Sequence, residues 1–290
     1  MLVGDSLQGQ MADSLLFLLH AKGLKQAGGG RRVINCPDIW NFNITVVFRR
    51  NNFVLDTPIK RCDASPAALA AVIPAMGDRN TSSPCTRPAD VYPRDIYNPN
   101  NYDIQAQPWY SGFLDSPHST LLILAASAHD HTVKEARPHL DTVLRLIQDR
   151  PRSGDLVVVR TLPQDHSGCS EFSVPLRNAS ENSALHGSAH EFWHGFPQIN
   201  LYVQDAARNA NARNSSANVA VLDVVPMTEL RPDGHARPGK DCLHYRLPGP
   251  IDYWNHLLFN GLHHLALTCS AKYEKKAVEQ HRDTAIPLAT

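Results

Sequence analysis

Three short apolar runs, alternating with segments that have helical features, constrain the fold of this chain more than any other feature. The runs are STLLILAASAH at 119–129, DLVVVRT at 155–161 and VAVLDVVPM at 219–227. Helical segments are expected at 133–149, 196–212 and 250–267. Continuous apolar strands are typical of a parallel sheet that is covered on both faces. The alternation therefore predicts an α/β fold with a mainly parallel central sheet.

The remaining segments give weaker signals. We expect a strand remnant at 1–3, a helix at 11–21, a flexible turn at 26–32 and two β segments around a polar turn at 44–56. Pro138 is expected to kink the helix at 133–149 or to delay its start. Residues 57–118 are rich in Pro, Asn, Asp and Ser and are expected to form a long irregular insertion. We interpret 1–290 as a single domain whose native N-terminal part is lacking, because a strand usually needs about five residues.

Composition excludes several classes of protein. Lys plus Arg and Asp plus Glu both number 28, so no net basic field exists to hold nucleic acid. Hydrophobic residues make up 42% of the chain, which is enough for a sizeable core, but no run is long enough to span a bilayer. CxxC and HExxH spacings are absent from the sequence, so we expect no metal and no bound cofactor.

Two short motifs have the residue types of a serine nucleophile and its base. Ser6 follows the strand remnant in Gly4-Asp5-Ser6, where it is either a nucleophile or a cap of the next helix. Asp241 and His244 are three residues apart just before a helix, which lets a carboxylate orient an imidazole, although a surface pair is the alternative. Serine needs such a base to attack a carbonyl. Because sites lie at the carboxyl ends of parallel strands, we expect both motifs to meet at one edge of the sheet.

Four stretches resemble the trichome birefringence-like proteins of plants and algae, also called the PC-esterase family. They read VGDSLQGQMADSLLFLL, TVVFRRNNFVL, LRPDGHARP and DCLHYRLPGPIDYWNHLL, and the resemblance runs from Val3 to about Leu258. It implies an SGNH/GDSL-like three-layer fold and a Golgi-lumenal enzyme with a type II membrane anchor upstream. By motif match, Ser6 is the nucleophile, Asp241 the orienting carboxylate and His244 the general base.

The activity implied by the resemblance is transfer of an acetyl group onto a cell-wall polysaccharide through acetyl-Ser6. The partners are then an acetyl donor, as co-substrate, and a polysaccharide acceptor. An acetylesterase that uses water as acceptor is the first alternative. A catalytically weak member that binds glycan is the second, and it is motivated by the absence of an Asn that the family has near Ala125 or Ala126.

Other groups are therefore candidates to stabilise the oxyanion or to bind substrate. The backbone N–H of Ser6 remains available in principle, and the further candidates are Gly4, Asp5, Gln8, Gln10 and Arg160. A structural salt bridge is an equal alternative for Arg160. We interpret Trp254 as a core residue, Trp109 as a core residue or a sugar platform, and His235 as a residue that supports the site but has no chemistry of its own.

Cysteines and glycosylation sequons favour a lumenal setting. The chain has six cysteines and four Asn-x-Ser/Thr sequons, at Asn43, Asn80, Asn178 and Asn214. Cys62 and Cys85 are the first pair that we expect to be bonded. The family pattern has a second cysteine where this chain has Arg246, so Cys242 is expected to join Cys169 or to stay free.

Overall fold

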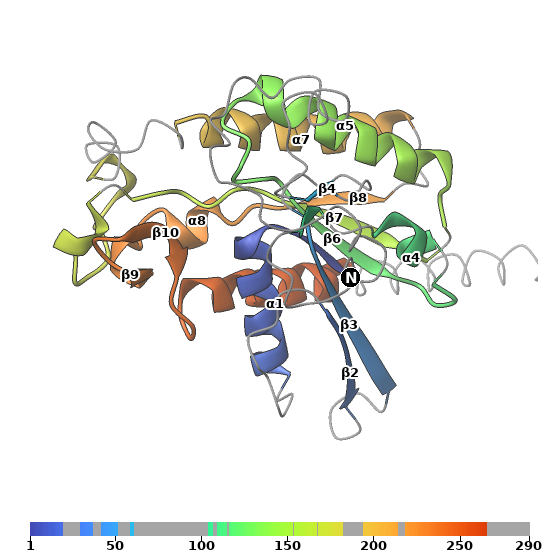
Figure 1. The fold of residues 1–290 in the computed structure, drawn as a ribbon, viewed down its shortest axis with the longest axis horizontal. Coiled ribbons are helices and arrows are strands. Elements are labelled where there is room, and N and C mark those ends of the chain that lie inside the picture. Colours follow the sequence, from blue (N-terminus) through green and yellow to red (C-terminus); the bar gives the residue numbers. More distant parts are fainter. Residues whose placement is uncertain are drawn as a thin grey trace, which may run out of the picture.

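A six-stranded sheet forms the centre of the computed structural model, which describes residues 1–19, 30–36, 42–51, 59–60, 104–106, 109–114, 116–152, 154–166, 168–181, 194–213 and 218–265. The strands are β1 Leu2–Gly4, β2 Gly30–Cys36, β3 Phe42–Arg50, β6 Leu121–Ala125, β7 Leu156–Arg160 and β8 Val219–Leu222. Their order is β2-β3-β1-β6-β7-β8, and only β2 runs antiparallel to its neighbour (Figure 1). The predicted α/β fold with a mainly parallel sheet is confirmed.

Helices cover both faces of this sheet and complete three layers (Figure 1). Helices α5 Val133–Asp149 and α7 Phe196–Arg213 lie on one face. Helix α1 Ser6–Leu18 and the helix at 250–265 lie on the other. In the described part of the chain, no helix is both long enough and apolar enough to cross a membrane.

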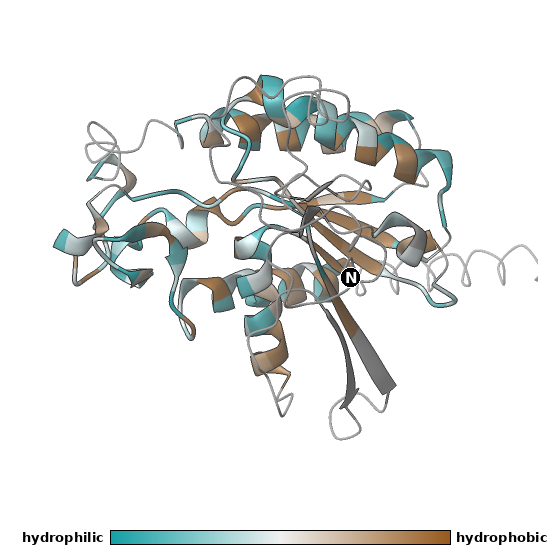
Figure 2. Cartoon of the chain, in the orientation of Figure 1, coloured by the Kyte–Doolittle hydropathy of each residue, from teal (hydrophilic) through white to brown (hydrophobic). Residues whose placement is uncertain are grey.

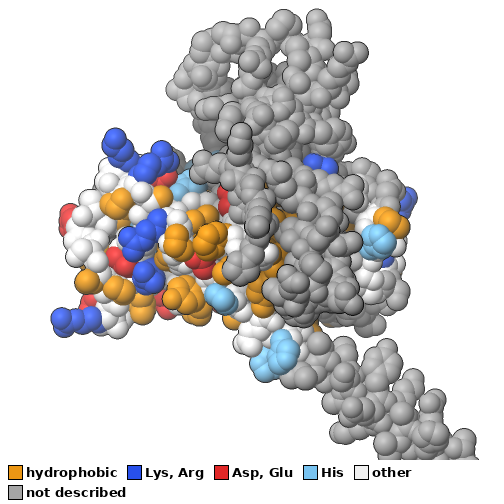
Figure 3. Space-filling view, turned by 90° about the horizontal axis from the view of Figure 1, so that it is seen from below, with side chains coloured by type: hydrophobic (Ala, Val, Ile, Leu, Met, Phe, Trp, Pro, Cys, Tyr) orange, Lys and Arg blue, Asp and Glu red, His pale blue; other side chains and the backbone are white. Residues whose placement is uncertain are grey.

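Alternation along the strands explains why both layers pack. In β6, Leu122 and Leu124 face the α5–α7 layer, whereas Ile123 faces α1 and the helix at 250–265. Because successive side chains of a strand point to opposite faces, a continuous apolar run serves both layers at once. Figure 2 shows the strands β6, β7 and β8 as the brown centre between helices with teal outer faces. On the side of α1, hydrophobic, basic and acidic side chains are interspersed over the described surface (Figure 3).

Local signals set several boundaries. Helix α5 begins at Val133 despite Pro138, because Thr132 caps it in a reciprocal capping box with Glu135. The expectation that Pro138 delays this helix was therefore wrong. The apolar run at 219–227 was expected to be one strand, but β8 ends at Leu222 and α8 Val225–Thr228 follows.

Three expectations for the first half of the chain need correction. Helix α1 begins at Ser6 rather than at residue 11, and residues 30–32 of the expected turn belong to β2. Within the expected irregular insertion at 57–118, β4 Ile59–Lys60 pairs with β5 Ile104–Ala106, and α4 Tyr110–Leu114 follows. The expected Cys62–Cys85 pair and the second β segment before residue 57 lie outside the described residues.

Trp109 is a core residue. Its side chain is 1% exposed, and its ring contacts the rings of Tyr110 and Phe113 at centroid distances of 5.7 and 6.4 Å. It lies in the cluster beneath α5 and α7, so it offers no surface for a sugar ring.

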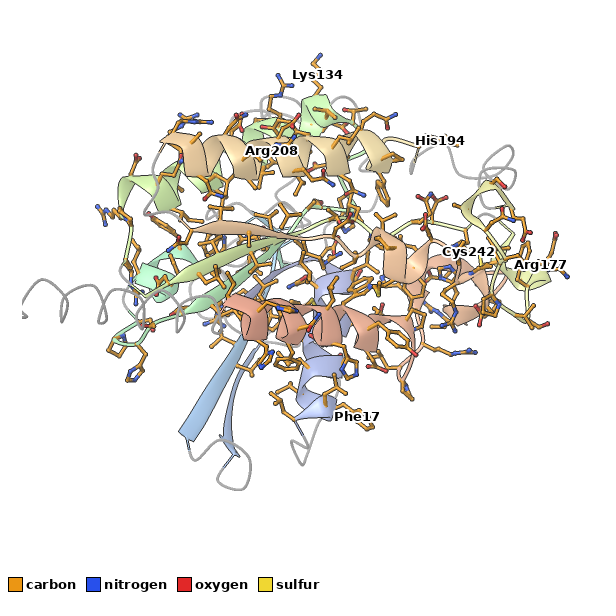
Figure 4. The ribbon with its side chains drawn as sticks, turned by 180° about the vertical axis from the view of Figure 1, so that it is seen from behind. Phe17, Lys134, Arg177, His194, Arg208 and Cys242 are labelled. Atoms are coloured by element: carbon orange, nitrogen blue, oxygen red, sulfur yellow. A yellow bond between two sulfur atoms is a disulfide. The ribbon has the colours of Figure 1, made fainter. Side chains whose placement is uncertain are left out.

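Truncation of this side chain tests that position. We expect Trp109→Ala to lower the free energy of unfolding by about 3–5 kcal/mol, because it leaves a cavity in the core. Urea unfolding followed by circular dichroism measures the change. Phe17→Ala is the matched control, because Phe17 is 62% exposed and lies at the far end of α1 (Figure 4). A loss below about 0.5 kcal/mol for Trp109→Ala would contradict the core position.

Candidate active site

Asp5 builds the turn that presents Ser6. Its carboxylate caps α1 by accepting hydrogen bonds from the backbone N–H groups of Leu7 and Gln8, at 3.0 and 3.4 Å. The second carboxylate oxygen accepts from the N–H of Ala128, in the loop after β6, at 2.9 Å. Asp5, and not Ser6, is therefore the cap of α1, and the Ser6 hydroxyl is left for another partner.

That partner is His244. Ser6 Oγ lies 2.6 Å from His244 Nε2, and His244 Nδ1 lies 2.9 Å from Asp241 Oδ2. Ser6 is the first residue of α1, whereas the other two side chains belong to β10 Asp241–Tyr245, which pairs with β9 His235–Arg237 outside the main sheet. The structure thus brings together the three side chains that the sequence predicted to meet. Their order, hydroxyl to imidazole to carboxylate, is the geometry of an activated serine.

Asp241 is held as a carboxylate. Burial alone would raise its pKa, but the backbone N–H of His244, the charge of its ring and the N–H of Leu243 together lower the pKa of Asp241 to about 2. An ionised Asp241 accepts the Nδ1–H of His244, which leaves Nε2 free to take a proton from Ser6. Arg237 also contacts Asp241 at 2.9 Å, from an exposed position where such a pair contributes little.

A side-chain amide and a disulfide are among the connections that hold β10 against the rest of the site. The Gln10 side chain donates to the carbonyl of Tyr245 at 2.6 Å and accepts from its N–H at 3.3 Å, which ties α1 to β10. A disulfide joins Cys169, in the short helix η2 Cys169–Glu171 after β7, to Cys242. The expected pairing of Cys242 with Cys169 is thereby confirmed, and Figure 4 shows Cys242 on the same side of the molecule as Arg177.

Four of the candidates for oxyanion stabilisation or substrate binding have structural roles instead. Both the oxygen and the nitrogen of the Gln10 amide are hydrogen-bonded to the backbone of Tyr245, and Asp5 is the cap of α1. A Cβ on Gly4 would meet the Cβ atoms of Gln8 and Ala125 at 2.6 and 2.7 Å, so Gly4 is required by close packing. Gln8 is fully buried, and its Oε1 accepts from Arg160, so it does not face an incoming ligand.

Arg160 is the fifth candidate, and it lies inside the protein. It is 0% exposed, donates to Gln8 Oε1 and to the Thr161 carbonyl at 2.8 and 2.7 Å, and lies 4.9 Å from the centre of the Trp254 ring. Burial lowers its pKa to about 10, while the charge of Asp5 acts in the opposite direction. Of the two alternatives for Arg160, these contacts favour the structural one, in which Arg160 supports α1 through Gln8. Trp254 is fully buried, as expected.

Sequence reasoning missed several residues that shape this site. Gln10 was considered only as an oxyanion donor, because its partner Tyr245 is 235 residues away. His166 was also missed: its Nδ1 lies 2.9 Å from Nε2 of His235, a supporting residue in the sequence interpretation, and the two histidines join segments that are distant in sequence. Among the described residues, no group of three or more His, Cys, Asp or Glu side chains is arranged to hold a metal ion.

Fold and site together define a class. A parallel sheet, helices on both faces and a serine at the end of the first strand form an α/β domain of the SGNH/GDSL type. Residues 126–261 match the PC-Esterase family, described as the GDSL/SGNH-like acyl-esterase family found in Pmr5 and Cas1p. The chain carries a PC-esterase domain and is a distant homologue of trichome birefringence-like proteins and xyloglucan O-acetyltransferases. The matched segment includes Asp241 and His244 and begins after Ser6.

Curated relatives from Arabidopsis thaliana support this assignment over part of their length. The chain is 40% identical over 145 residues to protein trichome birefringence-like 25, which covers 40% of the chain and 31% of that relative. It is 46% identical over 68 residues to protein trichome birefringence-like 20 and 38% identical over 66 residues to xyloglucan O-acetyltransferase 1. These matches cover 20% and 18% of the chain, and 14% and 16% of the relatives. The chain thus spans a third or less of the length of these relatives. No solved structure matches it.

The lowered pKa of Asp241 predicts an acid-sensitive contribution to stability. Because its folded pKa of about 2 lies below the ordinary 3.8, the contribution is present above 3.8 and is lost as the pH falls toward 2. We expect the stability difference between the unchanged protein and Asp241→Asn to shrink by roughly 1–2 kcal/mol on acidification, after allowance for screening.

Urea unfolding at a series of pH values measures this difference. Asp205→Asn is the control, because Asp205 is an exposed carboxylate paired with the exposed Arg208 on α7. A stability difference for Asp241→Asn that stays constant with pH would show that the carboxylate is not held by the contacts described above.

Proposed function

We propose that this protein is a serine-dependent O-acetyltransferase that acetylates a cell-wall polysaccharide hydroxyl. The observation that carries the proposal is the 2.6 Å contact between Ser6 Oγ and His244 Nε2, with Asp241 on the other side of the ring. A PC-esterase domain and relatives named xyloglucan O-acetyltransferases support acetyl transfer as the reaction.

The first half of the reaction loads the enzyme. His244 Nε2 takes the proton of Ser6 Oγ as that oxygen attacks the carbonyl carbon of the acetyl donor. The bond from that carbon to the donor's leaving group breaks, and the leaving group departs with the proton from His244. Asp241, ionised because its pKa is lowered to about 2, stabilises the imidazolium that forms in between.

The second half transfers the acetyl group. A sugar hydroxyl attacks the carbonyl of acetyl-Ser6 while His244 removes its proton, and the proton returns to Ser6 Oγ as the acyl bond breaks. Of the first-turn N–H groups of α1, Asp5 occupies those of Leu7 and Gln8. The Ser6 N–H, at the positive end of the helix, is the donor that we assign to the developing oxyanion.

We also propose the Golgi lumen as the compartment. The Cys169–Cys242 disulfide is the kind of bond that persists in an oxidising compartment, and Asn178 of one sequon lies exposed. A lumenal enzyme meets polysaccharide acceptors before they reach the wall, which agrees with the acceptor class.

Acetyl transfer is tested by incubating the protein with an activated acetyl ester, with and without xyloglucan oligosaccharide. We expect acetylated oligosaccharide to form, and Ser6→Ala to lower its rate by a factor of at least about 10³ because the nucleophile is lost. Mass spectrometry of the products measures both.

The same acetyl-transfer assay includes a control variant and distinguishes the alternative functions. Ser170→Ala removes an exposed serine near Gly239 and should leave the rate unchanged. Release of acetate that is independent of the oligosaccharide would instead favour the acetylesterase. If a serine-reactive fluorophosphonate does not label Ser6 in the folded protein, both enzymes are excluded and the glycan-binding alternative gains support.

The proposed compartment makes a separate prediction about thiols. In protein from its native source, Cys169 and Cys242 should resist alkylation until a reductant is added, since they are bonded to each other. Peptide mapping should also find glycan on Asn178, which is exposed. Two alkylated cysteines and an unmodified Asn178 would contradict the lumenal assignment.

A further inference from the structure

His166 and His235 form a buried pair behind the candidate base, and the proposed mechanism does not use them. They are 0% and 2% exposed, and His166 Nδ1 lies 2.9 Å from His235 Nε2. The outer nitrogen of each ring faces a backbone carbonyl. His166 Nε2 lies 3.0 Å from the carbonyl of Glu229, and His235 Nδ1 lies 3.1 Å from the carbonyl of His244.

These contacts cannot all be hydrogen bonds in a neutral pair. Carbonyl oxygens only accept, so His166 Nε2 and His235 Nδ1 must each donate an N–H. A neutral imidazole has a single N–H, so the two inner nitrogens would then face each other with bare lone pairs at 2.9 Å. One additional proton between them turns this repulsion into an N–H···N hydrogen bond. The complete series of three hydrogen bonds, from the Glu229 carbonyl through both rings to the His244 carbonyl, therefore requires three ring protons and one positive charge.

Burial opposes that charge. Desolvation lowers the pKa of His235 to about 4, a positive charge on His244 acts in the same direction, and the His244 carbonyl, Asp241 and Asp233 act against it. The titratable groups that act on His235 are Asp233, Asp241 and His244. Tyr245, whose ring stacks on His235, is in turn affected by the charges of Asp165 and Arg231. Above the ordinary histidine pKa of 6.5, His235 is therefore neutral and one contact lacks its proton. As the pH falls toward 4, His235 gains the proton that completes the three hydrogen bonds.

This series of hydrogen bonds connects two segments that are also joined by a disulfide. His166 lies three residues before Cys169, and His235 and His244 lie in the hairpin that contains Cys242. The disulfide fixes one point of this hairpin, whereas the hydrogen bond from His235 reaches the backbone of the base itself.

We propose that His166 and His235 bind one proton as a unit and act as positioning residues for His244, whose backbone carbonyl they hold most firmly when the third proton is present. The role of His244 as base rests on the proposed function, but the proton count rests on the geometry alone. The histidine pair would thus make the position of His244 depend on pH, in addition to the pH dependence that comes from the charge of His244 itself.

Nuclear magnetic resonance of protein with ¹⁵N-labelled histidine and ¹³C-labelled carbonyls tests the proton count without any activity. We expect a third ring N–H resonance to appear as one step below pH 6.5, and the His244 carbonyl shift to move with the same midpoint. In His166→Phe, that resonance and the step in the carbonyl shift should both be lost. Two independent ring titrations, or a His244 carbonyl shift that ignores the pair, would overturn the proposal.

The rate at which a fluorophosphonate labels Ser6, followed against pH, tests positioning. We expect His166→Phe to lower this rate about tenfold and to remove one pH-dependent step, because misplaced reacting groups cost rate. His139→Phe is the matched control. His139 is also buried, at 2% exposed, and is hydrogen-bonded to Asp130, but it lies on α5, on the other face of the sheet from α1. An equal loss in the control variant would show general destabilisation and overturn the positioning role. If Ser6 is unreactive in every variant, the proposed function fails, and the resonance experiment still decides the pair.

Discussion

The site depends on the carboxylate of Asp5, a buried group that accepts three backbone N–H bonds. Two of them start α1 at the residue after Asp5, and the third holds the loop that follows β6. Because an unpaired buried carboxylate is costly, these partners fix the turn in one conformation. Ser6 is therefore presented by a turn whose shape does not depend on substrate, and Arg160 supports the same helix through Gln8.

The candidate base, His244, lies outside the main sheet, so separate interactions must hold it in position. The β9–β10 hairpin shares no ladder with the main sheet and is held by Gln10, by the bond between Cys169 and Cys242 and by the histidine pair. Closing a loop of 73 residues contributes about 4 kcal/mol on the chain-entropy estimate. That value exceeds a single hydrogen bond of roughly 1 kcal/mol. Because it arises mainly from restriction of the unfolded chain, it stabilises the fold as a whole, whereas the polar contacts orient the hairpin.

Patterns that are local in sequence were predictable from the sequence. Strands β6 and β7 and the bounds of α5 follow from apolar runs and helical spacing, and the meeting of Ser6 with His244 follows from the carboxyl-edge rule and the family motifs. Contacts between distant segments were not predictable. Strand β2 is defined by its pairing with β3, which its own residues do not indicate. The structural role of Gln10 was missed because nothing in the sequence indicates that Tyr245 lies beside it. The missing Asn was visible in the sequence, but the inward turn of Gln8 was not.

A separation of 238 residues between nucleophile and base has a consequence for biosynthesis. A chain that is made from its N-terminus exposes Ser6 early, yet the strand that bears His244 is among the last described elements to be made. In the proposed mechanism, the serine has an ordinary hydroxyl throughout synthesis and is activated only when the hairpin docks. By the proposed route, an incomplete or misassembled chain cannot take an acetyl group at this position, so acetylation of Ser6 would require finished assembly.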